Sequence, residues 1–155
     1  MSDRPEATPS VGDERVVEVE TRIDAPAEVV FEYLTDADKY VRWMGVGAEL
    51  DPRPDGQYQL SMPGRNTAVG RYLVVDPPRR LVLTWGWEGH PHLPPGSSTI
   101  EITLEPDGEG TIVRLRHSGL PDDELRQQHR GGWVRYLGRL SVAASGGDPG
   151  PEPEG

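Results

Sequence analysis

Residues 70–87, GRYLVVDPPRRLVLTWGW, and residues 117–140, HSGLPDDELRQQHRGGWVRYLGRL, decide the fold of this chain. The first stretch predicts a hairpin of two apolar strands, because Pro77 and Pro78 cannot donate ladder hydrogen bonds and force a break between them. The second predicts a strand end followed by one long amphipathic helix, which begins near Asp122 with acidic residues in its first turn. A helix laid across an antiparallel sheet tends to enclose a cavity, so the two stretches together indicate a ligand-binding architecture.

Composition limits the classes of protein to which the chain can belong. It has 155 residues, no cysteine and a formal net charge of −10, which is enough chain for one domain with its own core and leaves no thiol for disulfide or thiolate chemistry. The acidic balance does not suit a phosphate backbone, so we expect no nucleic-acid partner. No apolar run approaches the roughly 20 residues that span a bilayer, and the N-terminus lacks a signal-peptide pattern. We therefore expect a cytoplasmic protein without membrane insertion.

Both ends of the chain are rich in Pro, Gly, Ser and acidic residues and contain few large apolar side chains. Such segments bury too little apolar surface to offset the entropy that they lose on ordering. We expect disordered tails over residues 1–14 and 145–155, and one folded domain over residues 15–144.

Hydrophobic periodicity in the body of the chain predicts the element order β-α-α-β-β-β-β-β-β-α. Residues 16–23 alternate between apolar and charged side chains and predict a half-buried strand. Pro26 suits the first turn of a helix, and Asp36 suits the cap of a second, short helix that reaches Trp43 and Met44. The remaining alternation predicts an α+β fold with a six- to seven-stranded antiparallel sheet, solvated on one face and covered by the C-terminal helix on the other.

The C-terminal helix carries an apolar stripe that would face the sheet. The stripe consists of Leu125, His129, Trp133, Leu137 and Leu140, flanked by Tyr136 and Ala144. Gly131 and Gly132 interrupt the helix, and each costs about 1 kcal/mol relative to Ala. We expect that cost to reflect either a close backbone approach or local flexibility.

Several short pieces of the chain, taken in order, carry a family resemblance. They are residues 23–36 (IDAPAEVVFEYLTD), Arg42-Trp43, Pro54-Asp55-Gly56, residues 70–87, residues 98–104 (STIEITL), residues 117–121 (HSGLP), and His129 and Gly132-Trp133 before Leu137 and Leu140. The chain resembles the SRPBCC (START-like) superfamily and, within it, proteins similar to the C-terminal domain of the activator of Hsp90 ATPase. The order and spacing of the pieces are specific for the fold and much less so for function, because this fold hosts binders, transporters, cyclases and hydroxylase components.

The resemblance implies a helix-grip (START/Bet v-like) fold. In this fold a curved antiparallel sheet wraps around the long C-terminal helix, two short helices follow the first strand, and an elongated pocket lies between sheet and helix. Placed on that layout, the residues expected to bind a ligand are Trp43, Tyr58, Leu60, Met62, Tyr72, Leu83, Trp85, Trp87, Leu115, His117, His129, Trp133 and Tyr136, with Trp43 and Met44 near the mouth. An apolar wall with a few polar tips is typical of small-molecule sites, although the same aromatic spacing also occurs in a packed core.

His117 and His129 are the candidate catalytic residues, because a pair of inward-facing histidines can transfer protons or bind a metal. Neither has a carboxylate at ligand spacing, and zinc normally takes three or four protein ligands, so we expect no metal and no cofactor. Two neutral histidines, hydrogen-bonded within the pocket wall, are the alternative interpretation. His90 and His92 lie in a Pro-rich loop, GHPHLPPG, which could cover the pocket mouth as a mobile lid.

Three hypotheses on function remain open. The first is a small-molecule carrier or sensor for a lipophilic or aromatic ligand. The second, suggested by the resemblance, is an enzyme similar to the aromatase/cyclase branch, with His117 or His129 as general acid–base; the sequence shows no other catalytic set. The third, also suggested by the resemblance, is a regulator of an Hsp90-type chaperone. We expect a monomer or a weak homodimer.

Overall fold

The structure, a computed structural model, describes residues 15–151. The expected N-terminal tail, residues 1–14, and residues 152–155 lie outside the described residues. The elements, in chain order, are β2 (Val17–Ile23), α1 (Ala27–Thr35), α2 (Ala37–Tyr40), β3 (Gly47–Leu50), β4 (Gln57–Met62), the 3₁₀ turn η2 (Pro63–Arg65), β5 (Asn66–Asp76), β6 (Arg80–Trp85), β7 (Ser98–Asp107), β8 (Gly110–Ser118) and α3 (Asp123–Ala144). Apart from the short turn η2, this is the predicted order.

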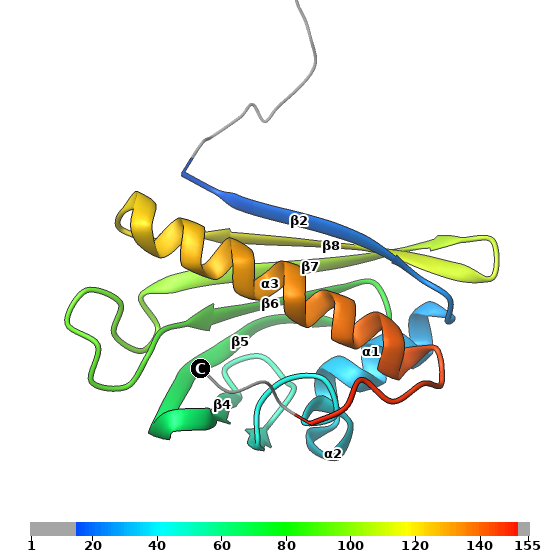
Figure 1. Cartoon of the computed structure of the whole chain (residues 1–155), viewed down its shortest axis with the longest axis horizontal. Coiled ribbons are helices and arrows are strands. Elements are labelled where there is room, and N and C mark those ends of the chain that lie inside the picture. The colour runs from blue at the N-terminus through cyan, green and yellow to red at the C-terminus, as the bar shows by residue number, and fades with distance from the viewer. Residues whose placement is uncertain (1–14, 152–155) are drawn as a thin grey trace, which may run out of the picture.

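The strands form one seven-stranded sheet in the order β2-β8-β7-β6-β5-β4-β3. Every neighbouring pair is antiparallel. The sheet curves, and α3 lies across its inner face (Figure 1). The predicted helix-grip fold is therefore confirmed. Within residues 15–151, no helix is both long enough and apolar enough to cross a membrane.

The outer face of the sheet carries rows of charged side chains across neighbouring strands. Arg114 of β8 contacts Glu20 of β2 at 2.8 Å and Glu105 of β7 at 2.9 Å. Arg80 of β6 contacts Glu101 of β7 at 2.8 Å. Exposed pairs of this kind contribute about 0.2–1 kcal/mol each, so their main effect is to keep this face solvated while the opposite face is buried.

The two short helices follow β2 as predicted, but the second ends early. The Asp36 side chain caps α2 by accepting hydrogen bonds from the backbone N–H groups of Asp38 and Lys39. We expected this helix to reach Trp43 and Met44, and that boundary is wrong: α2 ends at Tyr40. The following residues form a turn, in which Trp43 N–H donates to Tyr40 O at 3.1 Å. That three-residue spacing is tighter than the α-helical one and closes the last turn.

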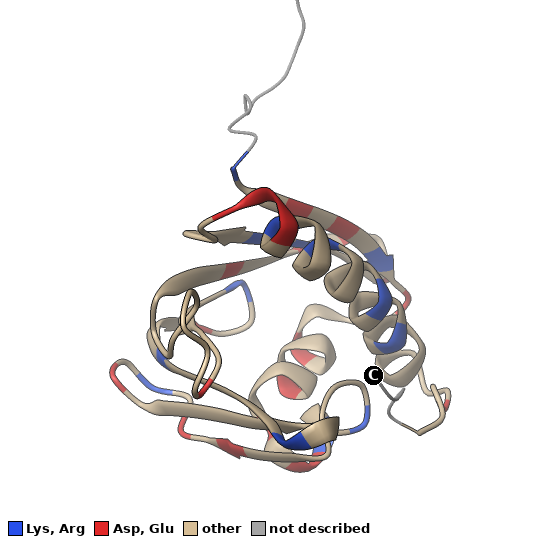
Figure 2. Ribbon diagram, turned by 60° about the vertical axis from the view of Figure 1, so that its left-hand side comes forward, with Lys and Arg blue, Asp and Glu red and all other residues tan. Residues whose placement is uncertain are grey.

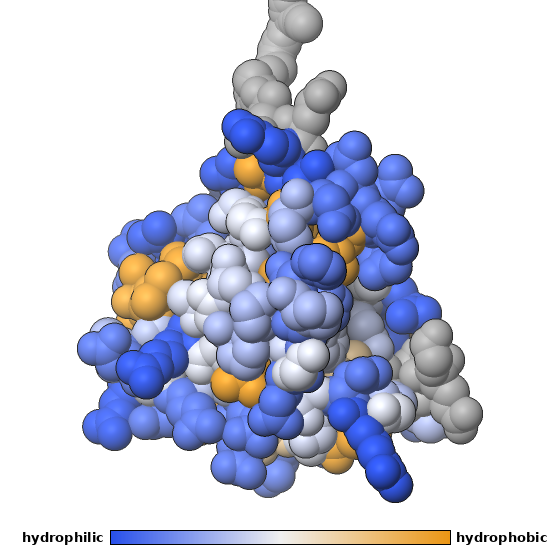
Figure 3. Space-filling model, turned by 90° about the vertical axis from the view of Figure 1, so that its left-hand side faces the viewer, coloured by the Kyte–Doolittle hydropathy of each residue, from blue (hydrophilic) through white to orange (hydrophobic). Residues whose placement is uncertain are grey.

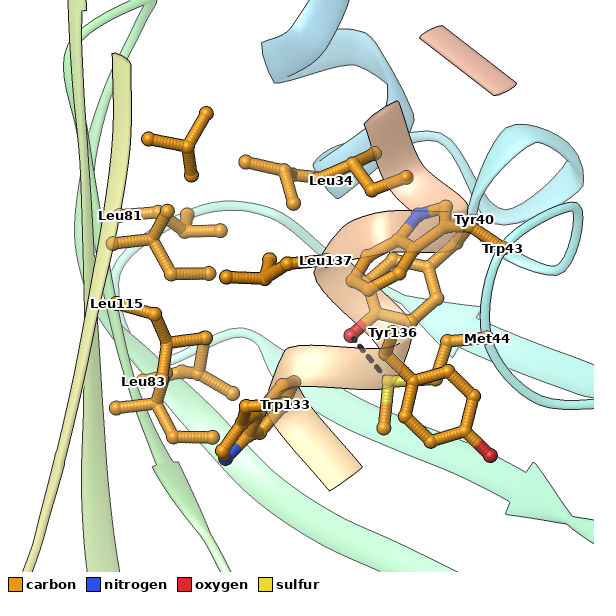
Figure 4. Packing of buried hydrophobic residues seen from close by; sticks show 14 of the residues in the cluster. Leu34, Tyr40, Trp43, Met44, Leu81, Leu83, Leu115, Trp133, Tyr136 and Leu137 are labelled. Atoms are coloured by element: carbon orange, nitrogen blue, oxygen red, sulfur yellow. Dashed lines mark hydrogen bonds between the residues drawn. The ribbon is translucent and has the colours of Figure 1, made fainter. Parts of the chain in front are cut away.

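Helix α3 begins where the sequence predicted. The Asp122 side chain accepts a hydrogen bond from Leu125 N–H at 2.8 Å, and acidic residues in the first turn suit the positive end of the helix dipole (Figure 2). The predicted stripe is buried, apart from half-buried His129. Leu137 points from α3 toward Leu81 and Leu115 of the sheet (Figure 4). Burial of such side chains, at about 1.5–3 kcal/mol each, attaches the helix to the sheet.

One explanation offered for Gly131 and Gly132, close backbone approach, is wrong. A Cβ atom added at either position would have no atom within 4 Å apart from its chain neighbours and the backbone of α3 itself. The two glycines therefore leave open space on α3 and do not admit a neighbouring backbone. Elsewhere a glycine is sterically required: a Cβ at Gly56 would lie 1.8 Å from Asp51 O.

Arg139 of α3 contacts both the segment that follows the helix and the turn after α2. Arg139 donates hydrogen bonds to Pro149 O at 2.9 Å and to Gly150 O at 3.0 Å, and its Nε donates to Trp43 O at 2.9 Å. Arg139 thus links the turn after α2 to residues 149–150.

Replacement of Gly131 by Ala should stabilise the protein by about 1 kcal/mol, because the exposed helical position has room for a methyl group and Ala has the higher helix propensity. Urea denaturation followed by circular dichroism measures the change. The matched variant Gly56→Ala should lower stability, because its methyl group would overlap Asp51 O. A loss of stability in Gly131→Ala would contradict the view that this glycine leaves open space.

Candidate ligand-binding pocket

A pocket of about 600 Å³ lies between the first half of α3, the segment after β6 and the end of the β4–β5 hairpin. From α3 the wall receives Leu125, Gln128, His129, Gly132, Trp133, Arg135 and Tyr136. From β6 and the segment after it come Trp85, Trp87, Glu88, Gly89, His90 and Pro91; Met44, Met62, Pro63 and Asn66 complete the wall. The end of the molecule that carries this segment is of intermediate hydropathy at its centre and mostly hydrophilic around it, with a few hydrophobic groups (Figure 3). The site therefore combines an aromatic wall with a polar rim.

The structure divides the residues that we expected to bind a ligand into two groups. Met62, Trp85, Trp87, His129, Trp133 and Tyr136 lie on the pocket wall. Trp43, Tyr58, Leu60, Tyr72, Leu83, Leu115 and His117 are buried in the core and do not line this pocket. Met44, expected near the mouth, is on the wall. The division arises because alternation along a strand predicts which face a side chain is on, but not how much of that face other side chains cover.

Arg135, Gln128, Glu88 and Asn66 were not expected at the pocket. Part of the signal was present in the sequence, because Gln128, Gly132 and Arg135 follow the i, i+4, i+7 spacing of one helical face. That face lies beside the apolar stripe and was hidden by it. Asn66 had no local signal, since its place depends on how the β4–β5 hairpin bends toward α3.

The hydrogen bonds of His117 define its protonation state. Trp133 Nε1–H donates to His117 Nδ1 at 3.0 Å, and His117 Nε2 lies 2.8 Å from Ser98 Oγ. Since an indole nitrogen can only donate, Nδ1 must be unprotonated and Nε2 carries the proton. Ser98 Oγ accepts from Nε2 and donates onward to Trp85 O at 2.7 Å. The chain of bonds is complete with a neutral imidazole.

His129 is neutral for the same reason. Trp87 Nε1–H donates to His129 Nε2 at 3.1 Å, so the proton lies on Nδ1, which donates to Leu125 O at 2.9 Å. Burial lowers the pKa of His129. Burial, together with nearby His129, lowers the pKa of His117 to about 3. In this geometry all four ring nitrogens are occupied by protein partners, which is the arrangement expected for structural histidines.

His117 and His129 are poorly placed for acid–base chemistry in the pocket. A histidine acting as general base needs a free ring nitrogen within reach of the substrate, and each of these would first have to release a tryptophan. Within residues 15–151, no group of three or more His, Cys, Asp or Glu residues is placed to hold a metal ion. His90 lies at the pocket, where its Nδ1 accepts hydrogen bonds from His92 N–H and Leu93 N–H.

Buried polar atoms beside the pocket are mostly satisfied. Tyr58 and Tyr40 hydroxyl oxygens lie 2.6 Å apart, and Tyr40 donates onward to Met44 Sδ at 3.9 Å. Among the described residues, Tyr72 Oη and Trp85 Nε1 are buried without a hydrogen-bond partner. An unmade hydrogen bond of this kind costs about 1–3 kcal/mol. Trp85 is also a wall residue, so this cost falls next to the pocket.

The curved sheet, the long helix and the pocket between them define a helix-grip domain of the SRPBCC/START-like superfamily. Residues 24–145 match the family described as "Activator of Hsp90 ATPase homolog 1-like protein". The chain belongs to this family.

Solved structures support the assignment. An AHSA1-like protein from Rhizobium etli is 46% identical, with a TM-score of 0.72, over 89% of this chain and 86% of the other. CalU16 from Micromonospora echinospora is 29% identical, with a TM-score of 0.70, over 84% of this chain and 76% of the other.

A curated sequence relative, an uncharacterised protein from Schizosaccharomyces pombe, is 27% identical over 103 residues. The matched region covers 65% of this chain but 29% of that curated relative.

The protein should lose stability as the pH falls below about 6.5, because the unfolded chain then takes up a proton that folded His117, with its pKa of about 3, does not accept. This contribution is fully present above pH 6.5. It amounts to about 2 kcal/mol between pH 7.5 and pH 5 for one such group, and the lowered pKa of His129 acts in the same direction. Urea denaturation at several pH values measures the loss.

The variant His117→Gln serves as the control, because an amide can still accept from Trp133 and donate to Ser98 but does not titrate. The pH dependence of its stability should be flatter than that of the original protein. Equal slopes for the two proteins between pH 7.5 and pH 5 would show that His117 is not held neutral.

Proposed function

We propose that the protein binds an apolar or aromatic small molecule in the pocket beneath α3. The observation that carries this proposal is the wall itself, in which Trp85, Trp87, Trp133 and Tyr136 line part of a space of about 600 Å³. That volume is within the range of about 300–1,000 Å³ that small-molecule sites occupy, and such sites combine apolar walls with few polar groups. The aromatic rings offer large contact areas without a high cost in side-chain entropy.

The hydrogen bonding of the wall supports a carrier or sensor over an enzyme. The two histidines that could act as acid–base groups are held by Trp133 and Trp87. These bonds also fix the orientation of both indole rings, so the wall is shaped before a ligand arrives. A preformed wall lowers the entropy that binding must overcome.

A regulator of an Hsp90-type chaperone is the second candidate, and family membership supports it. Chaperone binding would use the outer surface of the domain, so it is separable from ligand binding by experiment. Titration of isotope-labelled protein with Hsp90 should perturb a contiguous set of surface amide signals if this role holds. Unchanged spectra at saturating Hsp90 would reject it.

Gly132→Leu should weaken ligand binding about tenfold or more, because the new side chain would enter the pocket from a position with no atom within 4 Å of its Cβ. Phenylnaphthylamine, a neutral aromatic dye that fluoresces in apolar surroundings, is the probe, and its fluorescence titration gives the dissociation constant. Gly131→Leu is the matched control: it adds the same side chain to the same helix, at an exposed position outside the pocket wall.

The control should bind the dye as the original protein does. The proposal is wrong if the dye does not bind at all, or if the two variants change its affinity equally. Because both substitutions replace Gly by a better helix former, neither variant is expected to unfold. Circular dichroism confirms this before the titration is interpreted.

A further inference from the structure

Arg135 of α3 is a pocket-wall cation that no carboxylate neutralises within residues 15–151. It is the only Lys or Arg among the described residues that line the pocket, and Glu88 is the only carboxylate there. Arginines on the sheet, such as Arg80 and Arg114, lie within 3 Å of glutamates. On α3, Arg126 contacts Asp123 at 2.6 Å. The charge without a carboxylate partner is therefore located on the exposed part of the pocket wall.

The guanidinium group of Arg135 is positioned by the pocket wall. Its Cζ lies 5.2 Å from the centre of the Tyr136 ring, and Tyr136 is itself buried in the wall. A cation held over an aromatic face at this distance is attracted by the ring quadrupole. The contact leaves the N–H donors of the guanidinium free of a competing carboxylate, and their fork geometry matches a carboxylate or a sulfonate.

The other charged and titratable groups of the pocket wall that bear on an anionic ligand are Glu88, His129 and His90. Glu88 belongs to the segment after β6, across the pocket from α3. His129 is neutral, with both ring nitrogens occupied, and His90 Nδ1 accepts two backbone N–H groups. A negative group is therefore attracted toward α3 and repelled from the segment after β6, so Arg135 and Glu88 together orient an anionic ligand.

We infer that the ligand of this pocket has an apolar or aromatic body and an anionic group, and that Arg135 contacts the anionic group at the mouth. The inference rests on the proposed function, since it specifies the ligand class for the same pocket. The body would lie among the tryptophans, and the charged group would remain near solvent, where it keeps part of its hydration. This division avoids the high cost of burying an unpaired charge.

Two dyes with the same aromatic body test the role of Arg135 separately from the proposal that the pocket binds an apolar ligand. Anilinonaphthalene sulfonate carries an anionic group, and phenylnaphthylamine is its neutral counterpart. Arg135→Gln should weaken binding of the sulfonate about three- to fivefold and leave binding of the neutral dye within about twofold. Added sodium chloride should weaken sulfonate binding to the original protein more than to this variant.

The variant Arg130→Gln is the matched control. It makes the same change of charge on the same helix, but Arg130 lies outside the pocket wall and donates to Glu18 O at 3.1 Å. Its affinity for both dyes should be close to that of the original protein. Glu88→Gln should strengthen sulfonate binding, because it removes a negative charge from the far side of the pocket.

The possible outcomes distinguish the inference on the anionic group from the proposed function. If the neutral dye binds in the pocket and Arg135→Gln does not weaken sulfonate binding, the inference on the anionic group is overturned and the proposed function stands. The same conclusion follows if Arg130→Gln and Arg135→Gln weaken sulfonate binding equally, since the effect is then one of overall charge. If Gly132→Leu leaves the affinity of both dyes unchanged, the proposed function fails.

Discussion

The attachment of α3 to the inner face of the sheet is the interaction on which the rest of the structure depends. Its buried side chains provide the apolar contact, and the hydrogen bond from Trp133 to His117 fixes how the helix is rotated and where it lies along β8. A non-directional apolar contact could not do this alone, because it tolerates small shifts. Trp133 is also packed against Trp85, so the bond and the packing together define the position of its indole ring in the pocket wall.

The pocket exists because the two halves of α3 meet different surroundings. Toward its C-terminal end, Leu137 packs with Leu34 of α1 and Leu81 of the sheet, so that side chains fill the space (Figure 4). Toward its N-terminal end no short helix intervenes, and Gly132 removes a side chain from the facing surface. The aromatic residues there are held at the edge of the space by hydrogen bonds that cross from helix to sheet. Packing and polarity thus act together to keep the pocket open at one end.

Neutral histidines connect stability with function in this domain. Each accepts a bond from a tryptophan through a nitrogen that a general base would need free, so the groups that shape the wall are not available for proton transfer. Both imidazoles are neutral because they are buried and because an indole N–H can only donate, so the ring nitrogen that accepts from it carries no proton. The charged side chains on the pocket wall are Glu88 and Arg135, both at the rim. A polar group of a ligand would stay hydrated there.

By itself, the sequence determined the order of the elements, the cap at Asp122 and the buried stripe of α3, because periodicity, proline and capping are local properties. It also determined the helix-grip fold, through the spacing of several weak motifs. Which residues line the pocket was decided only by the tertiary structure: Tyr58, Tyr72 and His117 face inward as expected but lie beneath other side chains, whereas Arg135 reaches the mouth from beside the stripe. A one-dimensional pattern specifies the face of an element, but depth below a surface depends on what the opposing element covers.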